Sequence, residues 1–183
     1  MRVAHGLYVL SLFACGPAEP APAASPAASP AATAPTAPTV AAAELVPEKL
    51  DVKAEPEIYD LKADGDALFE QALAQAREQN KRVLVTIGGN WCVWCHKLHL
   101  LFRRDPAIGA RLERSFVELK LDTVAHESIV TRLAPNPKDG VPYLFVLAAT
   151  GEVLARQETG SLELGPRHDP AKVLAFLEAQ AGA

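Results

Sequence analysis

The fold is decided by the stretch Arg82-Val-Leu-Val-Thr-Ile-Gly-Gly-Asn-Trp-Cys-Val-Trp-Cys-His96. Residues 82–87 are a continuous run of strand-forming residues, as expected for a buried central strand. Two glycines and an asparagine break that run, and a helix is predicted from about Cys92 to Phe102. The sequence therefore places Cys92 and Cys95 at a junction between a strand and a helix.

This position has a chemical consequence for Cys92. The N-terminus of a helix presents unpaired N–H groups and the positive end of the helix dipole. A thiolate is favoured there, so the pKa of Cys92 is expected to fall below that of a free thiol. Cys95 lies one turn further into the helix, close enough to form a disulfide and too buried to compete as the nucleophile. A partly protonated His96 would add positive charge nearby.

The flanking sequence predicts a single α/β domain. Apolar periodicity and Asp caps predict further helices at residues 64–80, from 105, at 126–134 and from 169. Alternating or continuous apolar runs predict strands at residues 116–122, 143–147 and 152–156, the last two as a hairpin. This order is typical of an α/β fold with a central mixed β-sheet flanked by helices.

A resemblance to a known family is carried by residues 83–98 together with Gly140-Val-Pro-Tyr143. The chain resembles the thioredoxin superfamily over residues 57–183, and most closely the bacterial extracytoplasmic thioredoxin-like lipoproteins with a CxxC motif. The resemblance implies a cis peptide bond before Pro142, which then faces the two cysteines. It also implies that the backbone of Val141 can pair with a substrate strand. A trans Pro142 at the start of a strand is the alternative.

Two positions depart from the thioredoxin pattern. Thioredoxins carry a buried Asp six residues before the first Cys, where it helps to move a proton. This chain has Thr86 there, which cannot act as a general base at neutral pH. The large Trp94 between the cysteines also departs from the Gly-Pro found there in thioredoxins. Efficient general reduction is therefore not predicted, and the choice between reductase, isomerase and oxidase stays open.

The predicted function is thiol–disulfide exchange with protein substrates, serving cell redox homeostasis. Cys92 attacks a substrate disulfide to form a mixed disulfide, and Cys95 resolves it. Trp91 is expected to pack beside the motif and shield it, while His96 and Lys97 bias the local potential. The partners implied are protein thiols and disulfides and an upstream electron donor or acceptor, with no cofactor and no metal.

Other functions would use the same residues. A copper- or zinc-binding module or chaperone has four N/S ligands available, namely Cys92, Cys95, His96 and His99. The string Cys-Val-Trp-Cys-His is also the c-type haem attachment motif, although the sole Met, Met1, leaves no distal ligand. A redox-inactive interaction scaffold is a third alternative. If the protein binds no metal, His99 is expected to be a residue on the surface of a helix. His126 and His168 are then expected to be exposed to solvent.

The N-terminal residues 1–15 are predicted to be a targeting segment. Arg2 gives a positive start, and the apolar run at 7–14 has the length of a signal-peptide h-region but is too short to span a bilayer. The ending Leu-Phe-Ala-Cys15 resembles the bacterial lipobox, in which the Cys is lipidated before cleavage, although Phe13 replaces the usual small residue. A plain secretory signal, or an apolar N-terminus with an inert Cys, is the alternative.

Residues 16–43 are predicted to be a disordered tether. Positions 17–43 hold 13 Ala and 7 Pro, and Glu19 is their only charge. Proline stops the alanines from propagating a helix, so we expect an extended spacer of up to ~80 Å before a short extension at 44–56. A passive export spacer is the alternative. The expected location is the periplasmic side of the envelope, lipid-anchored, and the uncharged Gly16 favours the outer membrane.

Composition excludes several classes of protein. Hydrophobic residues make up 49% and charged residues 22%, which is typical of a soluble globular protein. A net charge of −4 offers no basic field for a nucleic acid, and three Cys cannot form a disulfide framework. The Gly-rich bend lacks both the Lys-Ser/Thr pair and the Gly-x-Gly-x-x-Gly pattern of nucleotide-binding loops.

Overall fold

The computed structural model describes residues 45–133 and 140–182. The predicted signal segment with Cys15 and the predicted tether both lie outside the described residues. Within the described ranges, no helix is long and apolar enough to cross a membrane.

The helices and strands follow one another in the predicted order. The helices are α2 (Gly65–Gln79), α3 (Val93–Arg104), α4 (Pro106–Ser115), α5 (Glu127–Leu133) and α6 (Pro170–Ala179). The long strands are β1 (Arg82–Gly88), β2 (Phe116–Asp122), β3 (Tyr143–Leu147) and β4 (Val153–Glu158). A small second sheet pairs β5 (Glu163–Leu164) with β6 (Arg167–His168). Sequence patterns do not predict this second sheet, because two-residue strands are too short to show a periodicity.

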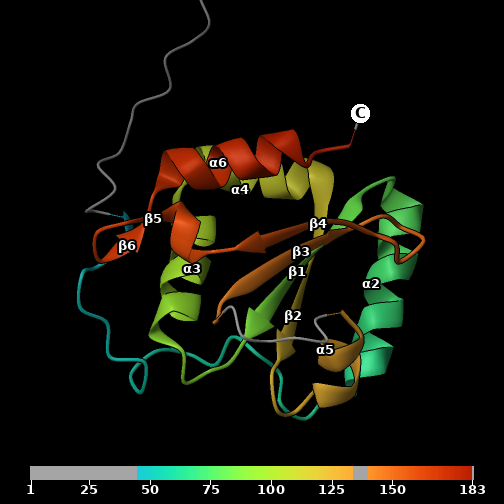
Figure 1. Cartoon of the computed structure of the whole chain (residues 1–183), viewed down its shortest axis with the longest axis horizontal. Helices are drawn as coiled ribbons and strands as arrows, with labels where there is room; N and C mark the ends of the chain where they lie inside the picture. The colour runs from blue at the N-terminus through green and yellow to red at the C-terminus, as the bar shows by residue number, and fades with distance from the viewer. Residues whose placement is uncertain (1–44, 134–139, 183) are drawn as a thin grey trace, which may run out of the picture. The chain divides into compact units, whose positions relative to one another are not determined.

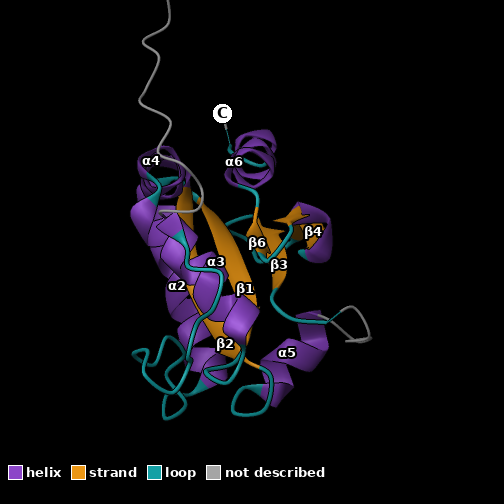
Figure 2. Cartoon of the chain, turned by 90° about the vertical axis from the view of Figure 1, so that its left-hand side faces the viewer, coloured by secondary structure: helices purple, strands orange, loops and turns teal. Residues whose placement is uncertain are grey.

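The four long strands form one mixed sheet in the order β2-β1-β3-β4 (Figure 1). β1 runs parallel to β2 and antiparallel to β3, and the predicted hairpin appears as the antiparallel pair β3 and β4. Helices α2 and α5 cover one face of the sheet, and α3, α4 and α6 cover the other. Turning the molecule shows helices on both sides of the strands (Figure 2). The predicted α/β fold class is confirmed.

The core explains why β1 is apolar throughout its length. Successive strand residues point to opposite faces, so Val83 and Val85 pack in the core cluster that contains α2 and α5. Leu84 faces the other way and packs in the cluster that contains α3, α4 and α6. A central strand with helices on both sides needs apolar residues at both sets of positions. Gly88 ends β1 on the face that carries α3.

Aspartates begin three helices as the sequence predicts. The carboxylates of Asp64, Asp105 and Asp169 accept hydrogen bonds from backbone N–H groups in the first turns of α2, α4 and α6. Each such cap stabilises the fold by about 1 kcal/mol. Helix α2 ends at Asn80, whose φ of 52° is the left-handed conformation common at helix C-termini.

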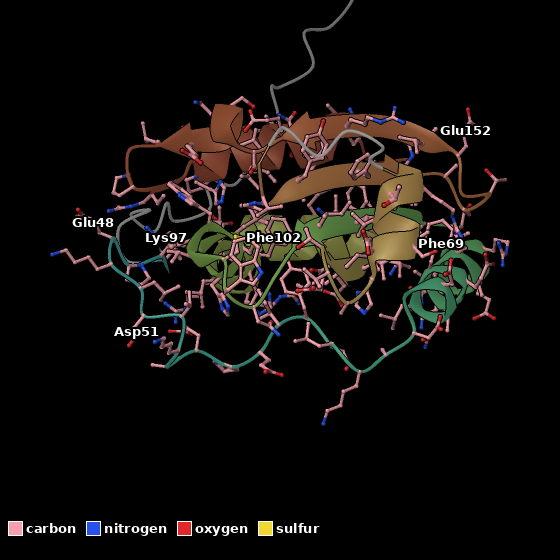
Figure 3. The ribbon with its side chains drawn as sticks, turned by 60° about the horizontal axis from the view of Figure 1, so that its bottom comes forward. Glu48, Asp51, Phe69, Lys97, Phe102 and Glu152 are labelled. Atoms are coloured by element: carbon pink, nitrogen blue, oxygen red, sulfur yellow. A yellow bond between two sulfur atoms is a disulfide. The ribbon has the colours of Figure 1, made fainter. Side chains whose placement is uncertain are left out.

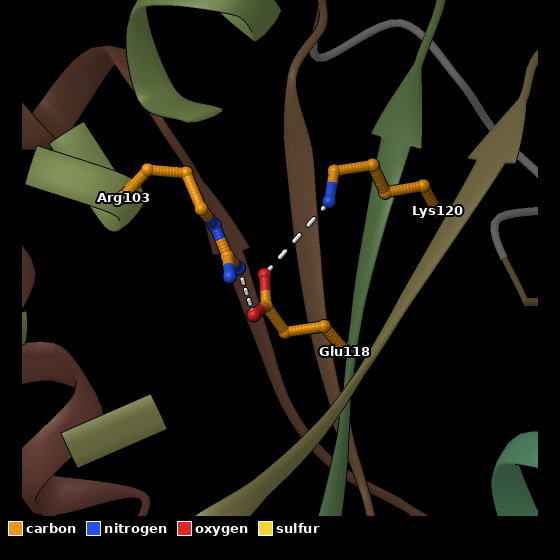
Figure 4. A network of polar contacts seen from close by, with 3 residues as sticks. All are labelled: Arg103, Glu118 and Lys120. Atoms are coloured by element: carbon orange, nitrogen blue, oxygen red, sulfur yellow. Dashed lines mark hydrogen bonds and ion pairs between the residues drawn. The ribbon is translucent and has the colours of Figure 1, made fainter. Parts of the chain in front are cut away.

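An ion-pair network joins α3 to the outer strand β2 (Figure 4). The Glu118 carboxylate pairs with the Arg103 guanidinium, and its second oxygen lies 3.8 Å from Lys120 Nζ. Because these groups are partly exposed, each pair contributes at most about 1 kcal/mol. The nearby imidazole of His99 is half-buried, and its pKa is lowered to about 4 by burial first and then by the charges of Lys120 and Arg103.

The extension before the domain packs against it. Leu45 and Val46 are buried in the core cluster that contains α3, α4 and α6. The Arg104 guanidinium donates a hydrogen bond to the Leu45 carbonyl at 3.2 Å. This end of the extension therefore lies on the same face of the sheet as the two cysteines of α3.

Candidate active site

Cys92 and Cys95 are joined by a disulfide at the start of α3, with their Cα atoms 5.2 Å apart. Cys92 is the N-cap residue of the helix, as its place after the Gly-Gly-Asn bend predicts. Cys92 is 5% exposed and Cys95 is 1% exposed, so Cys92 is the sulfur nearer to solvent. The structure brings together the two residues that the spacing singled out, in the unequal positions that were predicted.

Hydrogen-bond donors and acceptors surround the Cys92 sulfur. The Cys95 backbone N–H donates to Cys92 Sγ at 3.1 Å, and the helix dipole points its positive end the same way. Both interactions favour negative charge on this sulfur. The carbonyl oxygen of Val141 lies 3.8 Å from Cys92 Sγ on the opposite side of the site. A protonated Cys92 in the reduced protein has an acceptor there.

The peptide bond between Val141 and Pro142 is cis, as the resemblance implies. Thr159, which follows β4 and is buried, donates a hydrogen bond from its hydroxyl to the Pro142 carbonyl at 2.6 Å. Val141 itself is partly buried and packs against the cluster that holds the two cysteines. The turn that carries Val141 is therefore fixed beside the disulfide by a contact from the residue that follows β4.

Asn90 ties the segment before α2 to the active-site loop. Its side-chain oxygen accepts hydrogen bonds from the N–H groups of Ile58 and Tyr59, each at 2.9 Å. Its amide nitrogen donates to the Tyr59 carbonyl, also at 2.9 Å. The His96 ring donates from Nε2 to the Asn90 carbonyl at 2.9 Å, which fixes the loop itself. His96 is buried and supports the loop through this bond, and its predicted effect on the potential of the cysteines stays a prediction.

Trp94 is held between two basic side chains. The Lys97 ammonium lies 5.0 Å from the centre of the Trp94 ring, and the His168 ring packs edge-on against the same indole at 5.2 Å. Lys97 also donates hydrogen bonds to the carbonyls of Glu48, its neighbour in Figure 3, and of Pro166. One buried lysine thus joins the extension, α3 and the small sheet beside the cysteines.

Three expectations about side chains are wrong. Trp91 is 63% exposed and does not shield the disulfide. His168 and His126 are buried, and one ring nitrogen of each bonds to the backbone. His168 Nε2 donates to the Trp94 carbonyl at 3.3 Å, and His126 Nδ1 accepts from the Asp122 N–H at 3.0 Å. The partner of His168 lies 74 residues away in the sequence, so no local pattern indicates that contact.

The four candidate metal ligands are not brought together. Cys92 and Cys95 are bonded to each other, His96 points to a backbone carbonyl, and the half-buried His99 lies in the environment of Lys120 and Arg103. In the part of the chain that the structure describes, no three His, Cys, Asp or Glu residues are grouped so as to hold a metal ion. The geometry therefore favours redox chemistry at the two sulfurs.

His168 makes stability depend on pH. Burial lowers its pKa to about 4, with the charge of Lys97 acting in the same direction. The unfolded chain takes up this proton near pH 6.5, so stability is complete above that pH and falls as the pH drops towards 4. We expect the variant His168→Gln to lose about 2 kcal/mol less than the wild type between pH 7 and pH 5. Denaturant unfolding at the two pH values measures this, and equal losses would contradict it.

The sequence patterns do not indicate two buried polar residues of the site, Asp122 and Tyr59. Thr86 is buried on β1 without a carboxylate, as the sequence indicates. A carboxylate does lie close by, on the neighbouring strand, because Asp122 pairs in register with Gly88. Tyr59 is 1% exposed and belongs to one buried cluster with both cysteines. Because β1 and β2 are adjacent and parallel, their C-terminal ends lie side by side. The pairing of β1 with β2 therefore places Asp122 next to Gly88.

Comparisons with known proteins agree with this geometry. A thioredoxin-like family profile, Thioredoxin_7, matches residues 66–149. The structure of a disulphide isomerase from Xylella fastidiosa Temecula1 superposes with a TM-score of 0.59 at 24% identity, covering 69% of this chain and 98% of that one. The described domain has a thioredoxin-like fold.

Two other matches accompany this result. The thioredoxin-like domain aligns with the C-terminal domain of Neisseria meningitidis DsbD, in its oxidised form, with a TM-score of 0.47 at 21% identity, over 64% of this chain and 97% of that one. Spermatogenesis-associated protein 20 of Homo sapiens is 32% identical over 53 residues, which are 29% of this chain. The aligned segment spans 7% of the length of that curated relative.

Proposed function

We propose that this protein is an extracytoplasmic thiol–disulfide oxidoreductase that exchanges disulfides with protein substrates through Cys92 and Cys95. The observation that carries the proposal is the bonded pair at the N-terminus of α3, with Cys92 as the N-cap and the more exposed sulfur. Cys92 is the attacking sulfur, because its thiolate receives the Cys95 N–H and the positive end of the helix dipole. Cys95 is the resolving sulfur.

The surroundings of the pair favour a polypeptide substrate. Trp91 and Val93, on either side of Cys92, are exposed apolar side chains. The Val141 carbonyl, 3.8 Å from Cys92 Sγ, offers backbone hydrogen bonding to an extended chain. An apolar contact next to a backbone acceptor suits a peptide segment that carries a disulfide better than a small charged thiol. Trp91 thus acts as a substrate contact in this proposal.

The direction of exchange follows from the reduction potential of the pair. Equilibration of the full chain with mixtures of reduced and oxidised glutathione measures this potential, and reduction of insulin by the dithiol form measures activity on a protein disulfide. A potential near −270 mV, that of thioredoxin, indicates a reductase, and one near −120 mV indicates an oxidant. Failure to exchange with insulin in either direction would overturn the proposal.

We further propose that the chain is exported and anchored by a lipid on Cys15, with the outer membrane as its site. The support is the apolar run that ends in Leu-Phe-Ala-Cys15 and the uncharged Gly16 that follows. Expression with a radiolabelled fatty acid tests this proposal, with Cys15→Ala as the matched variant. Label in the wild type alone is expected. Label in both proteins, or in neither, would contradict lipidation at Cys15.

A further inference from the structure

The hydroxyl of Tyr59 is a buried polar group that the exchange mechanism leaves without a role. It finds no hydrogen-bond partner among the residues that the structure describes. A buried donor without a partner destabilises the folded state, so one that persists next to a reactive centre requires an explanation. Tyr59 precedes the segment matched by the thioredoxin-like profile.

Gly88 shows where this hydroxyl lies. A Cβ placed on Gly88 would be 2.5 Å from Tyr59 Oη and in still closer contact with Cys95 Sγ. Both atoms therefore border the small space above Gly88, and they are less than 5 Å apart because each is within 2.5 Å of the same point. The absence of a side chain at Gly88 is what lets the hydroxyl face the sulfur.

The backbone of Tyr59 is held in place independently of its hydroxyl. Asn90 makes three hydrogen bonds to the backbone groups of Ile58 and Tyr59, all at 2.9 Å. Asn90 is two residues before Cys92, so the segment that carries the hydroxyl is tied to the loop that carries the disulfide. The ring itself is almost completely buried against the cysteines. The hydroxyl is thus preorganised beside Cys95.

The phenol keeps its proton throughout the neutral pH range. Burial raises the pKa of Tyr59, and the negative charge of Asp122 raises it further. Asp122 lies at the end of β2, in register with Gly88. The Asp122 oxygen Oδ1 accepts hydrogen bonds from the N–H groups of Val124 and Ala125. The Tyr59 hydroxyl is therefore a protonated hydrogen-bond donor that has no acceptor among the described residues.

We infer that the Tyr59 hydroxyl donates a hydrogen bond to the Cys95 sulfur once the disulfide is opened, and thereby stabilises the Cys95 thiolate that resolves the mixed disulfide. The inference rests on the proposed function. When the S–S bond breaks, the two sulfurs separate to at least van der Waals contact, and Cys95 Sγ then needs a new partner. Tyr59 Oη is the unsatisfied donor on its border.

The resolving step then proceeds with a defined balance of protons and electrons. Cys95 loses its thiol proton to water, and Tyr59 O–H holds the resulting thiolate. The thiolate attacks Cys92 Sγ, the bond between Cys95 and Cys92 forms, and the bond from Cys92 to the substrate sulfur breaks. The electron pair leaves with the substrate sulfur, which takes up a proton from water. Tyr59 keeps its own proton and is unchanged at the end.

The test is the reaction of the reduced Cys15→Ser variant, whose two thiols are Cys92 and Cys95, with dithiobis-nitrobenzoate, an aromatic disulfide that releases a coloured thiol. Attack by Cys92 releases one equivalent in a first phase, and resolution by Cys95 releases a second. In Tyr59→Phe we expect the second phase to be about tenfold slower at neutral pH, with its pH profile shifted upward by about one unit. The rate of the first phase should not change, and the free energy of unfolding of the oxidised protein should not fall, because the ring and the Asn90 contacts remain.

Two controls make the outcome decisive. Tyr143→Phe removes a hydroxyl from a tyrosine that packs against the core cluster of α2 and α5, and it should leave both phases unchanged. The variant Cys95→Ser should show the first phase alone. An unshifted second phase in Tyr59→Phe would overturn the role of Tyr59 while leaving the exchange intact. Release of one equivalent of coloured thiol, in place of two, by the protein with both cysteines and Tyr59 intact would overturn resolution by Cys95, and the role of Tyr59 with it.

Discussion

Replacing Cys92 by serine is expected to abolish the reduction of insulin by this protein, with a loss of roughly a thousandfold or more. A serine hydroxyl at the start of α3 can still accept the Cys95 N–H, so the helix keeps its cap. It cannot act as the attacking thiolate, and Cys95, which is 1% exposed, cannot reach a protein disulfide in its place. The variant should therefore fold and remain inactive.

The Cys95→Ser variant is expected to behave differently. Cys92 can still attack, but the mixed disulfide with the substrate has no internal thiol to resolve it. A covalent adduct should therefore accumulate, visible on a non-reducing gel and lost on addition of excess thiol. Cys15→Ser is the matched control, because it removes a cysteine outside the candidate site. An adduct through Cys95 in the Cys92→Ser variant would reverse the roles assigned to the two sulfurs.

This asymmetry between the sulfurs could be predicted from sequence because it depends on local geometry. A strand, a Gly-rich bend and a helix follow one another within residues 82–104, so the first Cys must fall at the N-cap and the second one turn inside. The same locality explains why the Asp caps of α2, α4 and α6 were predictable. Each depends on a residue and the backbone two or three positions beyond it.

The rest of the site depends on contacts between distant segments, and these left no pattern. Tyr59 reaches the cysteines through a segment held by Asn90, 31 residues further along the chain. Lys97 and His168 appear as ordinary basic residues in the sequence, and only the packing of the extension and the small sheet buries them. The exposed position of Trp91 has the same origin, since nothing from elsewhere in the described chain covers it.

One of these distant contacts, that of Tyr59, borders a small space beside the disulfide. Gly88, the Tyr59 hydroxyl and the Cys95 sulfur border this space. A methyl group added at Gly88 therefore tests how tightly this space is packed. The adjacent Gly89 offers a position for comparison.

Gly88→Ala is expected to destabilise the oxidised protein by about 1–3 kcal/mol, the usual cost of an extra methyl group in a filled core. The new Cβ would meet Cys95 Sγ and Tyr59 Oη, and neither can retreat, because one belongs to α3 and the other is tied to Asn90. The φ angle of Gly88 is not among the positive ones, so the cost comes from crowding and not from backbone strain. Denaturant unfolding measures it.

Gly89→Ala is the matched variant, and the comparison with it decides the cause. Its Cβ would press on the indole of Trp91, which is 63% exposed and free to turn away, and on Asp122 Oδ2 at 3.0 Å. We therefore expect a smaller loss than for Gly88→Ala. Adding Tyr59→Phe to Gly88→Ala should recover part of the lost stability, because it removes one of the two atoms in the way. Equal losses for the two glycines, or no recovery in the double variant, would show that the space beside the disulfide is not filled by Tyr59 and Cys95.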